Sequence, residues 1–284
     1  MGVYAVTGSA SGMGAEVARK LTELGHTVIG VDVHDADVVA DLSHPRGRRR
    51  AADAVLAAAA GRLDGAVMAA GVGPLPGKDR LPVIPQVNFL GVVDLLTAWR
   101  PALAAAGSAK VVVFGSNSTI VTPGVPRAAV RALLAHDATK ATRAVMIYGR
   151  VAPQMAYAAS KLAVSRWVRS QAVTPDWAGE GIRLNVLAPG AVATPLLDQQ
   201  LASPGSAKTI RSFPVPVSSF GRPDQLADWA VFMLSDAAEF LCGSVVVVDG
   251  GSEAYFRGND WPKPLPLRQI IGFARRYRQF GRVR

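Results

Sequence analysis

Short, continuously apolar segments alternate along this chain with amphipathic segments, and this alternation restricts the fold more than any other feature. The apolar segments lie at 3–7, 27–32, 38–41, 64–71, 110–116, 183–190 and 244–251. Segments with helical periodicity lie at 14–24, 85–99, 157–175 and 224–234. A strand that is apolar at every position is buried on both faces, and intervening helices form the crossovers of a parallel sheet. The sequence therefore predicts an α/β fold, in which one doubly wound parallel sheet is covered by helices on both faces.

Two segments depart from this alternation. Residues 123–153 form a helical insertion of one or two helices, because apolar side chains recur there at helical spacing: Val130, Leu133, Leu134, Ala141, Val145 and Tyr148. Residues 253–284 form a basic C-terminal extension, in which a proline-rich linker at 261–267 leads into an amphipathic basic helix. We therefore divide the chain into one main α/β domain, 1–252, and the extension, 253–284.

Charge is concentrated in that extension. The chain has 284 residues, of which 50% are apolar and 18% charged, and a net charge of +10. Residues 257–284 hold eight basic residues and one acidic residue, and therefore seven of the ten net positive charges. The body is near neutral, which argues against nucleic acid as a partner. For the tail three interpretations remain open: it wraps a neighbouring subunit, it lies on an anionic membrane surface, or it is disordered.

The sequence offers no metal site and no disulfide. Cys242 is the single cysteine, and the four histidines, His26, His34, His44 and His136, are scattered without the spacing of metal ligands. The chain starts directly with a strand and has no apolar run of membrane-spanning length, so we expect no signal peptide. These features favour the reducing environment of the cytoplasm.

A glycine-rich turn joins the first strand to the first helix. The spacing of Gly8, Gly12 and Gly14 allows backbone N–H groups to approach a pyrophosphate at the positive end of the helix dipole. Asp32 ends the second strand, eighteen residues after Gly14, where a carboxylate accepts hydrogen bonds from both ribose hydroxyls. The same carboxylate repels a 2′-phosphate, so the sequence predicts a dinucleotide site that favours NAD over NADP.

The stretch after the third strand is expected at the adenine end of this site. Asp41 is placed to meet the adenine amino group and Leu42 the ring face, although an ordinary acid at a strand end explains Asp41 equally well. Four arginines follow: Arg46, Arg48, Arg49 and Arg50. They either reach an adenosine phosphate or start a solvated helix, and we favour the solvated helix.

Polar residues complete the pattern in a fixed order. Asn88 lies in a helix, Ser116 ends a strand, and Tyr157 and Lys161 lie one helical turn apart. Together with "TGSASGMG" and "PGAVATP", this ordered set resembles the short-chain dehydrogenase/reductase family over about residues 3–252. The extra helices before Tyr157 and the "DLS" stretch are similar to the bacterial 3α-hydroxysteroid dehydrogenase/carbonyl reductase subgroup.

The resemblance implies a Rossmann domain and an NAD(P)-dependent oxidoreductase acting on CH–OH groups. It implies four catalytic residues: Asn88, Ser116, Tyr157 and Lys161. It implies that the cofactor is bound by Thr7, Gly8, Ser11, Gly12, Met13, Gly14, Asp32, Asp41, Leu42, Ala70, Gly71, Tyr157, Lys161, Pro189, Gly190, Val192 and Thr194.

The roles implied by the resemblance have a physical basis. Tyrosine has an ordinary pKa of about 10, and a neighbouring ammonium together with an oxidised nicotinamide favours its phenolate. Tyr157 would exchange the proton of the alcohol or carbonyl, Ser116 would hold the substrate oxygen, and Lys161 would bind the nicotinamide ribose. Asn88 would hold a water that links Lys161 to solvent.

The chain also departs from the family pattern. The usual Asn-Asn-Ala-Gly after the fourth strand reads Met68-Ala69-Ala70-Gly71, which removes the amides that brace the sheet. The serine motif reads Gly115-Ser116-Asn117-Ser118, so Ser118 is a second candidate for the role of Ser116.

The substrate is expected under an apolar lid at 195–220, which favours a hydrophobic secondary alcohol or ketone, such as a hydroxysteroid or cyclic alcohol. The alternatives are a 3-oxoacyl-thioester reductase and a non-catalytic dinucleotide-binding sensor. The insertion lies in the region through which many relatives pair subunits, so we expect a changed interface in a homodimer or homotetramer. Our first expectation is a dimer through the last strand and the helix at 224–234.

Overall fold

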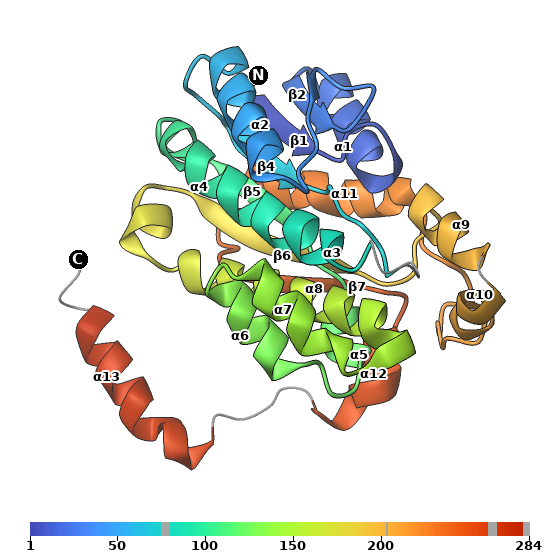
Figure 1. Ribbon diagram of the computed structural model, residues 1–284. Coiled ribbons are helices and arrows are strands. Elements are labelled where there is room, and N and C mark those ends of the chain that lie inside the picture. Colours follow the sequence, from blue (N-terminus) through green and yellow to red (C-terminus); the bar gives the residue numbers. More distant parts are fainter. Residues whose placement is uncertain (75–79, 203, 261–265, 281–284) are drawn as a thin grey trace.

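In the computed structural model, which describes residues 1–74, 80–202, 204–260 and 266–280, the strands form one parallel sheet. Its order in the described part of the chain is β3-β2-β1-β4-β5-β6-β7 (Figure 1). The strands are β1 (Val3–Thr7), β2 (Thr27–Asp32), β3 (Val38–Val39), β4 (Gly65–Met68), β5 (Lys110–Phe114), β6 (Arg183–Pro189) and β7 (Val245–Val248). The chain runs outward from β1 in one direction and from β4 in the other. The expected doubly wound fold is confirmed, with its crevice at the carboxyl ends of β1 and β4.

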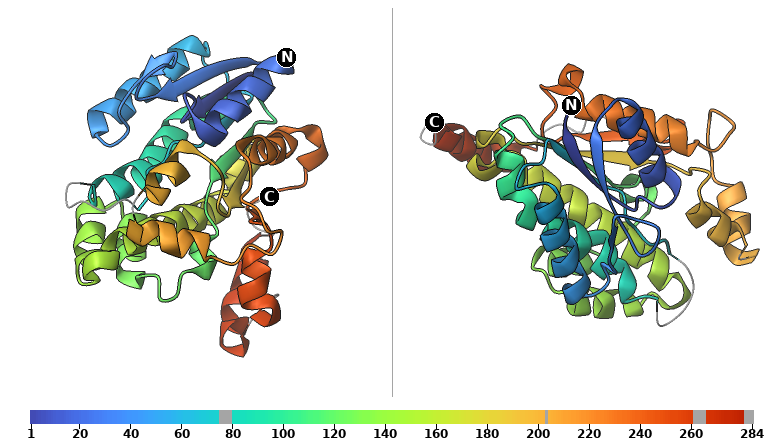
Figure 2. Two further views of the ribbon diagram at one scale, coloured as in Figure 1. Left: turned by 90° about the vertical axis from the view of Figure 1, so that its right-hand side faces the viewer. Right: turned by 90° about the horizontal axis from the view of Figure 1, so that it is seen from above.

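Helices cover both faces of this sheet. On one face lie α1 (Gly12–Glu23) and α11 (Pro223–Leu234), and on the other lie α2 (Pro45–Ala58), α4 (Gly91–Ala104) and α8 (Ala152–Gln171) (Figure 2). Alternate residues of a strand serve the two layers. In β5, Val111 and Val113 pack with the α4–α8 layer, whereas Val112 and Phe114 pack with α1 and α11. Burial on both sides explains why these strands are apolar throughout.

Several boundaries differ from the sequence expectation. The strand expected at 38–41 is confined to Val38–Val39, which pair with the end of β2. The helix expected at 85–99 starts earlier, as α3 (Val83–Pro85), passes through a π-helical segment (Gln86–Leu90) and continues as α4. The helix that carries Tyr157 begins five residues before it and ends at Gln171, ahead of Pro175.

The insertion consists of two helices, α6 (Arg127–Leu134) and α7 (Ala138–Met146), after the short α5 (Ser118–Val121). Both pack on α8, with Val130, Leu133 and Val145 fully buried (Figure 1). Asp137 caps α7, since its side chain accepts a hydrogen bond of 2.7 Å from the Lys140 N–H. The insertion therefore covers the outer side of the helix that carries Tyr157.

The segment expected as a lid forms α9 (Pro195–Leu201) and α10 (Pro204–Arg211) beside the carboxyl end of the sheet (Figure 1). The C-terminal extension starts as α12 (Ser252–Arg257), which packs against α5, and ends as α13 (Ile270–Phe280). Most of the linker expected at 261–267 lies outside the described residues. None of the helices described is both long enough and apolar enough to cross a membrane.

Candidate active site

The glycine turn between β1 and α1 has a backbone path that side chains would block. Gly8 has φ of +71°, and a Cβ there would lie 2.7 Å from the Ala70 nitrogen. A Cβ on Gly14 would lie 2.1 Å from the Gly8 carbonyl oxygen. These approaches open the start of α1 toward the crevice, where the N–H groups of a helix attract anions. The turn fits the pyrophosphate of a dinucleotide.

Asp32 lies at the end of β2 and supports this turn. Its carboxylate accepts hydrogen bonds from the Ala10 N–H at 2.9 Å and the Val33 N–H at 2.7 Å. It also lines a pocket of about 560 Å³. The predicted cofactor residues that line the same pocket are Gly8, Ser11, Gly12, Met13, Gly14, Asp41, Leu42, Ala70, Gly71 and Thr194. A carboxylate with free lone pairs therefore faces a nucleotide-sized pocket.

At the far end of this pocket, one arginine has a structural role that the sequence did not indicate. Arg48 is buried, and its guanidinium donates to the Leu42 carbonyl at 3.0 Å and to the Asp94 carboxylate at 2.7 Å. It also donates to the Gln86 side chain at 3.1 Å. The solvated helix start expected for the four arginines is therefore wrong for Arg48, which fixes the loop that carries Leu42. Arg46, Arg49 and Arg50 are exposed.

A second pocket, of about 310 Å³, joins the first through shared residues such as Met13, Gly71 and Thr194. Six further predicted site residues line it: Ser116, Tyr157, Lys161, Pro189, Gly190 and Val192. The two pockets thus form one crevice along the carboxyl edge of the sheet. Residues predicted from distant sequence positions come together in it.

The Ser116 hydroxyl is oriented by its own turn. Its oxygen accepts the Ser118 N–H at 3.1 Å, which leaves the hydroxyl hydrogen free to donate. Burial raises the pKa of Tyr157, and a hydrogen bond from the Ser116 side chain partly offsets this increase. In the protein alone, desolvation outweighs that hydrogen bond, so the pKa shift is opposite to the one expected for the complex with oxidised nicotinamide.

Lys161 lies one turn after Tyr157 and is buried. Its ammonium donates to the Phe114 carbonyl at 2.7 Å and lies 6.0 Å from the centroid of the Tyr157 ring. Burial lowers the pKa of Lys161 from 10.5 to about 8. A positive charge is therefore held under Tyr157, at the end of β5, at a cost in folding free energy.

This cost predicts a pH dependence of stability. Below pH 8 Lys161 is charged in both the folded and unfolded states, and burial penalises the folded state. Between pH 8 and 10.5 the folded state binds fewer protons, so stability rises with pH. The difference in free energy of unfolding between the wild-type protein and Lys161→Met should shift in favour of the wild-type protein by about 2 kcal/mol from pH 7 to pH 10. Denaturant titrations at each pH measure it. Lys140→Met, at an exposed lysine, is the control. A stability difference between the wild-type protein and Lys161→Met that does not change with pH would contradict the lowered pKa of Lys161.

Thr7 and Asn88 do not line either pocket, and their side chains instead hold loops that do. The Thr7 hydroxyl accepts the Ala70 N–H at 3.1 Å. The Asn88 side chain accepts the Val72 N–H at 2.9 Å and donates to the Val72 carbonyl at 3.0 Å. These bonds brace the loop after β4, where the amides usual in the family are missing. The proposed role of Asn88 in holding a water stays a prediction.

Asn117 and Gln154 line the second pocket and were not predicted from the sequence. Asn117 lines the second pocket and donates to the Asp249 carboxylate at 3.1 Å, so the turn of Ser116 is tied to the end of β7. No local pattern links these two residues, which are 132 positions apart. Gln154 also lines the pocket, and its position three residues before Tyr157 on the same helix was a usable signal.

The outer wall of the second pocket is apolar and comes from the lid. Leu196, Leu197, Ile210 and Phe213 line it. Phe213 in turn lies 5.6 Å, between ring centroids, from Phe256 of α12. Thr194 links the lid to the cofactor crevice, since its hydroxyl caps α9 by accepting the Leu197 N–H. Among the described residues, no group of three or more His, Cys, Asp or Glu side chains is placed to hold a metal ion.

Comparison with known proteins gives a consistent result. A family model described as enoyl-(acyl carrier protein) reductase matches residues 125–253. The chain is 35% identical over 257 residues to the 3-alpha-hydroxysteroid dehydrogenase/carbonyl reductase of Comamonas testosteroni, covering 90% of this chain and 98% of that protein. It is 31% identical to the coniferyl-alcohol dehydrogenase of Pseudomonas sp. strain HR199, covering 87% of this chain and 94% of the relative.

A solved structure is also similar. The crystal structure of the 3-alpha-hydroxysteroid dehydrogenase from Pseudomonas sp. B-0831 in complex with NADH superimposes with a TM-score of 0.85. It shares 41% sequence identity and covers 90% of this chain and 99% of that one. The similarity is therefore one of the overall fold and not of a single motif.

Proposed function

The chain belongs to the short-chain dehydrogenase/reductase family, and we propose that it transfers a hydride between NAD and a hydrophobic secondary alcohol or ketone. The observation that carries this proposal is the position of Ser116, Tyr157 and Lys161. They lie where a nucleotide-sized pocket with an acidic end meets a second pocket with an apolar wall. A hydride donor and a hydrophobic acceptor bound in these pockets would meet beside the Tyr157 hydroxyl.

The proton chemistry of the proposed reaction follows from the hydrogen bonds of the site. In oxidation, Tyr157 would accept the proton of the substrate hydroxyl, and in reduction it would return this proton to the carbonyl oxygen. The Ser116 oxygen accepts the Ser118 N–H, and its single hydroxyl hydrogen, donated to Tyr157 in the protein alone, could turn to a bound substrate. It would therefore donate to the substrate oxygen as negative charge develops there. Bound NAD would accept or supply the hydride.

Lys161 would make Tyr157 a base near neutral pH. Its ammonium is buried and its carbonyl partner carries no formal charge, so its field is weakly screened within the protein. That field favours the phenolate of Tyr157 over the neutral phenol. The remaining ammonium hydrogens are available to the ribose hydroxyls of the cofactor, next to Gly71, where an added Cβ would lie 3.7 Å from the Lys161 nitrogen.

The substrate class is proposed from the second pocket. The lid residues Leu196, Leu197, Ile210 and Phe213 present an apolar wall. A rigid hydrophobic molecule with few polar groups fits such a wall. The named activities of two similar proteins, on 3-alpha-hydroxysteroids, support a hydroxysteroid or another cyclic alcohol as substrate.

A second candidate is a 3-oxoacyl-thioester reductase. The match of residues 125–253 to a family described as an acyl-carrier-protein reductase favours it. Asp32 argues against it, because such biosynthetic reductases commonly use NADPH, whose 2′-phosphate a carboxylate repels. A non-catalytic sensor is less well supported, since it would not require Tyr157 and Lys161 together.

An activity panel separates these candidates. We expect formation of NADH, followed by its absorbance, from hydroxysteroids and cyclic alcohols. Aliphatic alcohols and 3-hydroxyacyl thioesters should be poor substrates. Preferred turnover of the thioesters would favour the second candidate. Tight binding of NAD without turnover of any member of the panel would count against catalysis on these classes.

The assembly is proposed as a homodimer through β7 and α11, with a homotetramer as the alternative. The insertion covers α8, whereas α11 exposes Trp229 and Phe232, at 43% and 47%, in edge-to-face contact at 6.1 Å. Paired exposed aromatics are typical of an interface core. Trp229→Asp should lower the mass measured by sedimentation from that of a dimer to that of a monomer. Met146→Asp, on the exposed side of the insertion, should leave the mass unchanged. The reverse result would move the interface to the insertion.

A further inference from the structure

Helix α13 has an apolar stripe and a basic remainder. Ile270, Phe273, Ala274 and Tyr277 follow the i, i+3, i+4, i+7 spacing that places side chains on one side of a helix. Residues 266–280 contain the arginines Arg268, Arg275, Arg276 and Arg278 and no acidic residue. The helix therefore combines an aromatic stripe with three positive charges, and Arg268 adds a fourth just before it.

This helix stands apart from the sheet and its covering helices (Figures 1 and 2). No residue of α13 is buried, and its stripe is open to solvent, with Phe273 exposed to 54% and Tyr277 to 77%. Ile271, beside the stripe, is exposed to 83%. Aromatic and aliphatic side chains at this exposure indicate a surface that binds something outside the described body.

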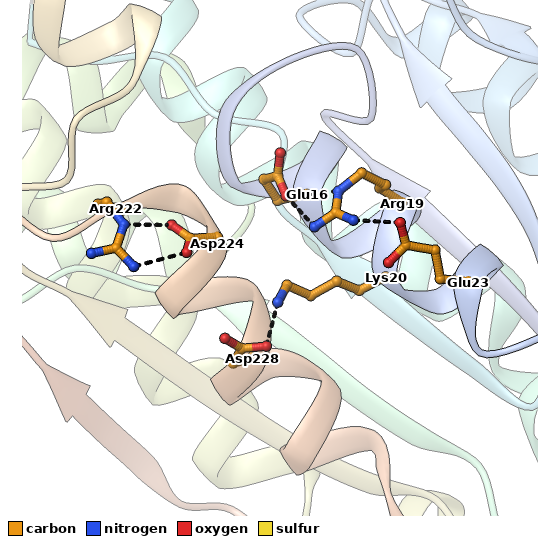
Figure 3. A network of polar contacts seen from close by, with 7 residues as sticks. All are labelled: Glu16, Arg19, Lys20, Glu23, Arg222, Asp224 and Asp228. Atoms are coloured by element: carbon orange, nitrogen blue, oxygen red, sulfur yellow. Dashed lines mark hydrogen bonds and ion pairs between the residues drawn. The ribbon is translucent and has the colours of Figure 1, made fainter.

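The most obvious protein partner is the α11 face of a second copy, but none of the acidic side chains described on this face is free of a basic partner. On this face Asp224 accepts two hydrogen bonds from Arg222, at 3.0 and 2.9 Å, and Asp228 is paired with Lys20 of α1 (Figure 3). Farther along, Asp236 is paired with Lys110 and Glu239 with Arg183. Arginines of α13 would have to displace existing partners. In our proposed assembly the aromatic side chains of this face are also buried by a partner subunit.

We propose that α13 lies in the headgroup region of an anionic membrane surface, with its stripe toward the acyl chains and its arginines toward lipid phosphates. A basic helix with an aromatic side has the composition of an in-plane membrane helix. The cytoplasmic location expected from the sequence would place it before the negatively charged leaflet. Seven of the ten net charges lie in 257–284, so attraction would act on this segment and leave the near-neutral body in solution.

The test uses the full chain and flotation with two kinds of vesicle, phosphatidylcholine alone and phosphatidylcholine mixed with phosphatidylglycerol. We expect binding to the mixed vesicles that decreases at high salt, and little binding to phosphatidylcholine. The triple variant Arg275→Gln, Arg276→Gln, Arg278→Gln should bind about 100-fold more weakly, since each basic residue near the surface contributes about fivefold. Arg46→Gln, Arg49→Gln, Arg50→Gln removes the same charge from α2 and should bind like the wild-type protein.

A further variant separates lipid from protein as the partner. Phe273→Ser with Tyr277→Ser keeps every arginine and should also lose vesicle binding, while the mass of the assembly in sedimentation stays the same. A change in that mass would show that the stripe contacts a second copy, and would overturn the proposal. Absence of binding to the mixed vesicles would overturn it as well, as would an equal loss in the control. Circular dichroism of each variant verifies that the body is folded.

Discussion

Tyr157→Phe should lower kcat for the best alcohol substrate by about 100- to 10,000-fold, the range found for loss of a general acid–base group. The substitution removes one oxygen atom and leaves the ring in place between the two pockets. It removes the acceptor of the Ser116 hydrogen bond and the only group in our proposal that exchanges the substrate proton. Hydride transfer would then have to produce an alkoxide or a protonated ketone without a partner for the proton.

Binding of NAD is the control within this variant. Tyr157 was expected among the cofactor-binding residues but lines the second pocket and not the first, so the Kd for NAD should change by less than about threefold. Tyr148→Phe, which removes a hydroxyl from the insertion, should retain activity. If Tyr157→Phe kept more than about a tenth of the wild-type kcat, the loss would be smaller than the contribution of a general acid–base group. Another group would then carry the proton.

Much of this site was predictable because the fold brings strand ends together. The carboxyl ends of parallel strands meet at one edge of the sheet, so residues that follow β1, β2, β5 and β6 in the sequence become neighbours. The glycine turn and Asp32 follow β1 and β2 at this edge, and Ser116 and Pro189 lie farther along the same edge, after β5 and at the end of β6. The continuously apolar strands predicted a parallel sheet, and the helical spacing of Val130, Leu133 and Val145 predicted the helices of the insertion. Both patterns are local in the sequence and could therefore be recognised.

The remaining features depend on partners far away in the sequence. Arg48 lies in a run of arginines with no sign of burial, and its buried position depends on Asp94 and Gln86, which are 46 and 38 residues away. The π-helical segment around Asn88 could likewise not be predicted from the helical periodicity of apolar residues. It places the Asn88 side chain against the backbone of Val72, and no local signal specifies that pair. The direction of the Tyr157 pKa shift could also not be predicted, because desolvation depends on packing that the sequence does not show.

Cofactor choice should depend on Asp32 alone among the acids of the first pocket. In Asp32→Ala the ratio of kcat/KM with NAD to kcat/KM with NADP should fall by about 100- to 1000-fold. Charge-assisted hydrogen bonds to the ribose hydroxyls contribute about 1.5 to 3 kcal/mol. Relief of repulsion between the carboxylate and a 2′-phosphate adds at least about 1 kcal/mol at 4 Å. Steady-state kinetics with both cofactors on one substrate measure the ratio.

The structure supplies a control for this experiment and one complication. Asp41 lines the same pocket, but its carboxylate accepts the Ser43 N–H at 2.8 Å within its own loop, so Asp41→Ala should leave the ratio nearly unchanged. Asp32 also holds the Ala10 N–H of the glycine turn, so Asp32→Ala should weaken binding of both cofactors through the pyrophosphate. This loss is common to both cofactors and cancels in the ratio of kcat/KM values, whereas a loss of preference for NAD changes the ratio. A variant that loses activity with NAD and NADP equally would therefore show that Asp32 shapes the turn without selecting the cofactor.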